Sequence, residues 1–94
     1  MATYVTLMNF TDQGVRDIKG SPARYEVFKS LAEGLGLRVT NALWTVGAYD
    51  VVMISEGSEE AMMKATLKLA SQGNVKTQTL RAFNAAEMRN LSAG

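Results

Sequence analysis

The sequence predicts an α+β domain built from one antiparallel sheet and two long helices. Short segments rich in β-branched and aromatic residues alternate with longer segments whose apolar residues recur at helical spacing. Near the middle of the chain, Leu43–Ile54 contains two apolar runs that flank a turn at Gly47. This pattern is typical of a β-hairpin, and we expect the hairpin to lie at the centre of the domain.

The size and charge of the chain limit its organisation. Its 94 residues predict a single domain over residues 1–94. A domain this small gains little from one core, so association with copies of itself is expected. The chain has ten Lys and Arg residues and nine Asp and Glu residues, with no run of like charge. We therefore expect no nucleic-acid partner, because such binding needs a basic face.

The chain has neither cysteine nor histidine. This composition excludes disulfides, Cys–His and Ser–His–Asp catalysis, the common zinc sites and the usual haem ligands, so we predict no metal and no cofactor. The N-terminal segment Met1–Val5 lacks the basic and long apolar regions of a signal peptide, and no segment has the length of a membrane span. We expect a cytoplasmic protein without a membrane partner.

The first half of the chain predicts a strand, a helical turn and a long helix. Tyr4–Phe10 is rich in β-branched and aromatic residues and predicts the first strand. Thr11 or the residue after it can cap a short helical segment. Ser21 as a cap, with Pro22 at the first helical position, predicts the start of a longer helix. Its apolar residues recur at helical spacing up to Gly34, which permits the helix to end.

The hairpin and the second long helix follow. We predict strands at about Leu37–Val46 and at Tyr49–Glu56, joined by the turn at Gly47. Ser58 is a good cap for the next helix, and the acidic residues after it suit the positive end of the helix dipole.

The last two elements complete a recognisable order. Val75–Phe83 alternates as a fourth strand, and Asn84 with Glu87 forms a variant capping box for a short C-terminal helix. The order β-α-β-β-α-β with a terminal helix is the ferredoxin-like arrangement. In that arrangement both long helices cover one face of a four-stranded antiparallel sheet and leave the other face open.

Alternation along the strands predicts which side chains lie on the open face. Such a face would be too apolar for a monomer, so we expect it to contact a second subunit. The assignment depends on whether a residue has an odd or an even position along its strand. A shift of one residue in either hairpin strand would reverse the assignment for that strand. The residues assigned to the open face are Tyr4, Met8, Phe10, Ala42 and Trp44.

Several segments resemble the GYD-domain family, which is named for a Gly, Tyr and Asp signature present here as Gly47, Tyr49 and Asp50. The resemblance implies a dimeric α/β barrel, in which two ferredoxin-like subunits press their open sheet faces together. It implies no particular activity, because related barrels include cofactor-independent oxygenases, haem-handling enzymes and stress-responsive proteins. The matching segments cover nearly the whole chain: Asn9–Thr11 with Gly14, Trp44–Gly47, Tyr49–Val52, Gly73–Val75 and Thr79–Phe83.

Tyr49, Asp50 and Arg81 are the candidates for catalysis. Asp50 could act as a general base with Tyr49 as a hydrogen-bond donor. We favour a structural interpretation, in which Asp50 binds nearby backbone and Gly47 supplies a backbone angle that other residues resist. Arg81 is expected to pair with Asp50 or Glu56, within or between subunits, in preference to a ligand's anion.

Three functional hypotheses follow, and the residues leave open whether the chain is an enzyme. The favoured one is a non-catalytic homo-oligomer that assembles through its open face, with room for a small apolar or aromatic ligand. The second is a cofactor-independent oxygenase-like or isomerase-like enzyme with a cavity near Trp44, Tyr49, Asp50 and Arg81. The third is haem or porphyrin binding without a histidine ligand.

Overall fold

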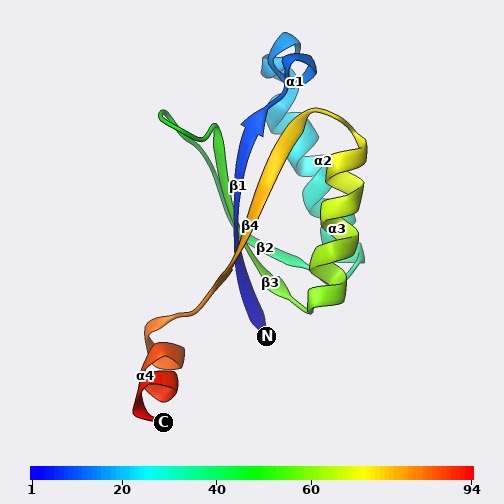
Figure 1. The fold of residues 1–94 in the computed structure, drawn as a ribbon. Coiled ribbons are helices and arrows are strands. Elements are labelled where there is room, and N and C mark those ends of the chain that lie inside the picture. Colours follow the sequence, from blue (N-terminus) through cyan, green and yellow to red (C-terminus); the bar gives the residue numbers. More distant parts are fainter.

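One antiparallel sheet of four strands, covered on one face by two long helices, forms the body of the protein. The computed structural model describes residues 1–94, and Figure 1 shows both long helices on the same side of the sheet. In the spatial order β2-β3-β1-β4, the strands are β1 (Ala2–Phe10), β2 (Arg38–Trp44), β3 (Val51–Gly57) and β4 (Val75–Ala82). The helices are α1 (Asp12–Arg16), α2 (Ser21–Gly34), α3 (Glu59–Ser71) and α4 (Ala85–Ala93), with a 3-10 turn, η1 (Ile18–Gly20), after α1. The predicted ferredoxin-like arrangement with a C-terminal helix is confirmed.

Three helices begin at the capping residues that the sequence predicts. The hydroxyl of Thr11 caps α1 and that of Ser58 caps α3, each by accepting a hydrogen bond from a backbone N–H of the first turn. In α4, Asn84 and Glu87 form the capping box, with donor–acceptor distances of 2.9 and 2.8 Å. Such caps satisfy N–H groups that have no partner inside a helix. None of the helices combines the length and apolarity needed to cross a membrane.

The core lies between the sheet and the two long helices, and it contains side chains that we expected on the open face. Tyr4 and Met8 are each only 6% exposed and belong to the core. Phe10 and Ala42 pack against the same core, and Trp44 reaches α2. The prediction that these five residues form the open face is therefore wrong. The first strand is apolar on both sides, so its alternation fits two orientations, and the helices cover the side with the larger side chains.

A bulge in β2 explains the error in that strand. The pairing with β3 shifts register between Val39 and Asn41, so β2 contains one extra residue at this point. Beyond the bulge, Ala42 lies on the same side as Val39, facing the helices, as does Trp44. Uninterrupted alternation would place them on the opposite side. A bulge reverses the face of every residue that follows it.

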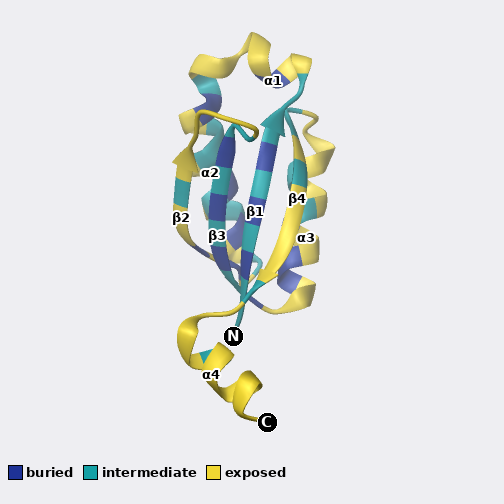
Figure 2. Cartoon of the chain, turned by 60° about the vertical axis from the view of Figure 1, so that its left-hand side comes forward, coloured by how far each residue is buried: buried dark blue, intermediate teal, exposed yellow.

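The face away from the helices carries two uncharged rows of side chains, which we call the open-face patch. Figure 2 views the molecule from this side, with α2 and α3 behind the sheet. The strand pairing places one residue from each strand in each row, and six of these eight residues are apolar. The rows are Asn41, Ile54, Val5 and Leu80, and next to them Leu43, Val52, Leu7 and Gln78.

The C-terminal helix α4 stands clear of this body. Figures 1 and 2 show it beyond the end of the sheet at which β1 begins, away from α2 and α3. None of its residues is buried. It contributes to the elongated shape of the chain, whose principal extents are 49 × 30 × 17 Å.

The loop between α3 and β4 packs closely against the start of α1. The backbone N–H of Thr11 donates to the Asn74 carbonyl at 3.0 Å, and Gln13 Nε2 donates to the Gln72 carbonyl at 2.8 Å. A Cβ atom on Gly14 would lie 2.1 Å from the Asn74 carbonyl oxygen. This close approach of two backbone segments restricts the position to glycine.

Replacing Gly14 by alanine is expected to lower the free energy of unfolding by about 1–3 kcal/mol, because the added methyl group must displace the Asn74 backbone. Gly34→Ala is the matched control, since this glycine ends α2 with open space around it. Alanine there is expected to be neutral or to stabilise by up to about 1 kcal/mol. Urea unfolding followed by circular dichroism measures both variants, and equal stability would contradict the close contact at Gly14.

Candidate functional site

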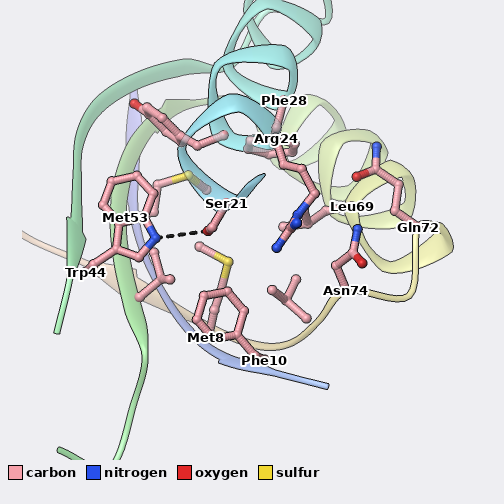
Figure 3. Close-up of a pocket in the computed structure, with 13 residues that line it drawn as sticks. Met8, Phe10, Ser21, Arg24, Phe28, Trp44, Met53, Leu69, Gln72 and Asn74 are labelled. Atoms are coloured by element: carbon pink, nitrogen blue, oxygen red, sulfur yellow. Dashed lines mark hydrogen bonds between the residues drawn. The ribbon is translucent and has the colours of Figure 1, made fainter. Parts of the chain in front are cut away.

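Trp44 links the end of β2 to the first turn of α2. Its Nε1 donates a hydrogen bond to Ser21 Oγ at 3.0 Å (Figure 3). Its ring meets the ring of Tyr25 edge to face, with the centroids 5.7 Å apart. Ser21 is the first residue of α2 and not its cap, contrary to the sequence prediction, and Gly20 precedes the helix without a side-chain cap. The serine hydroxyl instead joins the helix to the sheet.

A cavity of about 50 Å³ lies beside Trp44, between the sheet and helices α2 and α3. Nine of its 13 lining residues are apolar, and Figure 3 shows Met8 and Phe10 of β1 on one side and Phe28 of α2 on the other. An engineered protein cavity that binds benzene measures ~150 Å³. The space here therefore suits a few water molecules and not an aromatic ligand.

Three of the four polar residues around this cavity, Ser21, Arg24 and Asn74, have side-chain partners within the chain. Arg24 Nη1 donates to the backbone oxygen of Asp17 at 2.6 Å and to its carboxylate at 3.1 Å. Asn74 Oδ1 accepts a hydrogen bond from Gln13 Nε2 at 3.0 Å. A ligand would have to compete with these internal partners, and the arrangement favours packing over binding.

Asp50 joins the base of the hairpin to the central strand. Its Oδ2 accepts a hydrogen bond from Phe10 N at 2.9 Å, and its own N–H donates to the Met8 carbonyl at 2.8 Å. Its carbonyl accepts a hydrogen bond from Thr45 N at 2.8 Å, which closes the loop of the hairpin. Within that loop Gly47 has a φ of +145°, a value that side-chain-bearing residues rarely adopt.

Tyr49 lies towards the open face. Its hydroxyl is 3.2 Å from Gln78 Oε1, in hydrogen-bond contact with a residue of the open-face patch. This contact spans the sheet from the start of β3 to β4, with β1 between them. The side chains on the two sides of the hairpin loop therefore point to opposite faces of the sheet. Trp44 points towards α2, and Tyr49 lies at the rim of the open-face patch.

Arg81 lies far from the other candidates. It pairs in register with Tyr4, whereas Asp50 binds Phe10, six residues and roughly 20 Å further along β1. The chain forms two ion pairs, and neither includes Arg81. The expected pair with Asp50 or Glu56 is therefore not formed within one chain, and its intersubunit form stays a prediction.

The structure thus brings some predicted site residues together and separates others. Met8, Phe10 and Trp44 meet at the cavity, but on the helix side of the sheet. The three catalytic candidates do not converge, since Asp50 binds backbone, Tyr49 borders the open face and Arg81 is at the far end of β1. No group of three or more acidic side chains lies where it could hold a metal ion.

Sequence reasoning missed the residues of the open-face patch. A signal for them exists in β3, where the apolar residues Val52 and Ile54, which are partly buried, alternate with buried Val51 and Met53. A strand that is apolar on both sides is typical of a sheet that is covered on both faces. The same reasoning missed the contact of Trp44 with α2, because the bulge that directs it has no sequence signal.

Matches to known proteins span most of the chain. A family model described as GYD domain matches residues 4–91. A relative from Thermus thermophilus, named glutamine synthetase and cystathionine beta-lyase binding protein, is 37% identical over 90 residues, which cover 94% of this chain and 95% of the relative. The crystal structure of TTHA0845, also from Thermus thermophilus, matches with a TM-score of 0.56 and 22% identity, over 90% of this chain and 96% of that one. This last similarity concerns the fold alone.

Asp50→Ala is expected to lower the free energy of unfolding by about 1–3 kcal/mol, because the partly buried N–H of Phe10 loses its acceptor. Asp50→Asn keeps an acceptor oxygen at the same position, so we expect a loss of about 1 kcal/mol or less. Urea unfolding compares the two variants. Wild-type stability of the alanine variant would contradict the role of Asp50 as the link between hairpin and central strand.

Proposed function

Because this chain belongs to the GYD-domain family, we propose that it is a homo-oligomeric, non-catalytic module that binds other proteins. In this proposal two copies associate through their open-face patches, and the assembled module recognises an enzyme. The observation that carries the proposal is the open-face patch, two uncharged and largely apolar rows of side chains that no element of the chain covers.

The composition of the patch supports its use as a subunit interface. Leu43 and Leu80 are 57% and 42% exposed in the single chain. Burying the exposed part of such a side chain stabilises association by about 1 kcal/mol. Charged residues lie outside the two rows, with Arg38 and Glu56 beyond one end and Lys76 beyond the other. An apolar centre with a charged rim is typical of protein interfaces.

A second copy of the chain is the partner that the patch fits best. In a two-fold symmetric interface the same surface meets itself, so a charged face would bring like charges together. The two rows contain no charge and avoid this repulsion. The apolar character of β3 on both sides also favours a permanent second layer over a transient contact.

The geometry around the candidate site supports a non-catalytic role. The cavity beside Trp44 is too small for haem or an aromatic substrate, and Arg24 and Asn74 on its lining already have partners within the chain. An enzyme that used Asp50 and Arg81 together would need them in one site, and they lie at opposite ends of β1 within the chain.

The relative from Thermus thermophilus suggests the class of partner. That protein is named for binding glutamine synthetase and cystathionine β-lyase. We take the corresponding enzymes of the organism that encodes this chain as the first candidates. A partner of this kind would place the module in the cytoplasm, as the sequence leads us to expect.

Leu80→Lys is expected to weaken self-association by about tenfold or more, because it places an ammonium group in an apolar row of the open-face patch. Met63→Lys is the matched control, since Met63 is 56% exposed on α3, which covers the other face of the sheet. The same change there should alter association by about twofold or less. Sedimentation equilibrium measures both variants, and a wild-type chain that stays monomeric at micromolar concentration would contradict the proposal.

Binding to an enzyme partner is tested by biolayer interferometry with immobilised chain. We expect saturable, micromolar or tighter binding to glutamine synthetase or cystathionine β-lyase from the same organism, and none to an unrelated enzyme of similar size. Binding to neither candidate would refute the proposed partners. Equal binding to all three enzymes would show that the contact is unspecific and would also refute them.

A further inference from the structure

We infer that α4 is an arm that packs on the second copy of the chain, so that two subunits exchange their C-terminal helices. This inference rests on the proposed self-association through the open-face patch. It assigns a packing partner to an element that has none within its own chain, where Figures 1 and 2 show it clear of the sheet and of the long helices.

A capping box fixes the first residue of α4, although none of the side chains of this helix is buried. Asn84 and Glu87 form a reciprocal capping box, with the Asn84 side chain accepting from Glu87 N at 2.8 Å and the Glu87 side chain accepting from Asn84 N at 2.9 Å. The helix has nine residues and no buried side chain. Isolated helices of this length are marginal in water, and most helices are stabilised by packing. A capped helix of this length therefore needs a surface to pack on.

One side of α4 offers apolar side chains for such packing. Met88 and Leu91 are 50% and 60% exposed, and residues three apart lie on the same side of a helix. Phe83, just before the helix, is also exposed. Within the chain the Arg81 guanidinium lies over the Phe83 ring, whereas Met88 and Leu91 stay exposed.

The direction of the arm is set at the end of β4. The Arg81 guanidinium lies 4.3 Å from the centre of the Phe83 ring, and Nη1 donates to the carbonyls of Thr3, at 3.3 Å, and of Ala82. These contacts tie the end of β4 to the start of β1. Figure 1 shows the chain leaving from this end towards the open side of the sheet, opposite to α2 and α3. Arg81 thus contacts the segment that leads into the arm.

A second copy is the occupant that this geometry favours. The arm continues directly from Leu80, which belongs to the open-face patch, so a subunit docked on the patch is the nearest apolar surface outside the chain. A nine-residue helix is about 13 Å long, enough to cross nearly three strands of a neighbouring sheet. Its charges cancel, with one Glu87 and one Arg89, so it meets an identical chain without repulsion.

The double variant Met88→Glu and Leu91→Glu tests the arm in the full-length chain. We expect the dimer dissociation constant to rise by about tenfold or more, because two carboxylates replace the apolar contacts. Ala86→Glu with Asn90→Glu is the matched control, since it adds the same charge to the opposite side of the helix. We expect this control to change the constant by about twofold or less. Circular dichroism verifies that both variants keep the fold.

A direct readout uses the absence of cysteine from the chain. An Asn90→Cys chain carrying a nitroxide is mixed with ¹⁵N-labelled wild-type chain, and broadening of amide signals in the labelled chain reports proximity between copies. We expect broadening confined to one region of the labelled subunit. A dimer with no such broadening, and with a wild-type dissociation constant for Met88→Glu/Leu91→Glu, would overturn the arm and leave the proposed self-association intact. A monomeric wild-type chain would overturn both.

Discussion

Two helices can cover only one face of the four-stranded sheet, and most features of this protein follow from that constraint. On the covered face, Tyr4 and Met8 pack with α2 and α3 to form the core. On the other face, Val52 and Ile54 of the same sheet are only partly buried. A sheet that is apolar on both sides needs a second layer, and this chain has no further element to supply it. The open-face patch therefore stays uncovered, and α4 has no surface to pack on within its own chain.

The three residues that name the family have structural tasks around the hairpin. Gly47 adopts a φ of +145° in the loop, Tyr49 reaches Gln78 on the open face, and Asp50 binds the backbone of β1. The contacts of Tyr49 and Asp50 hold the loop of the hairpin to β4 and to β1. Residues that specify a hairpin determine a fold and do not by themselves determine a reaction.

The partners of Arg81 in the structure differ from the partner that the sequence leads us to expect. In the sequence it is a cation in a mostly apolar strand, and the expected partner is a carboxylate. In the structure it contacts the Phe83 ring and two backbone carbonyls at the point where α4 leaves the body. Carbonyl oxygens and an aromatic face satisfy a guanidinium without a counter-ion. These contacts take the place of the ion pair that the sequence leads us to expect.

The sequence by itself determined the elements, their order and three helix starts, because capping residues such as Thr11 and Ser58 act on the N–H groups beside them. It also indicated that one sheet face stays apolar and uncovered. Only the tertiary structure decided which residues that face carries. The alternation of β1 fits two orientations, and the bulge after Val39 reverses the direction of Trp44 without any local signal. Distances across the sheet, such as that between Asp50 and Arg81, depend on strand order and register, which are properties of the folded chain.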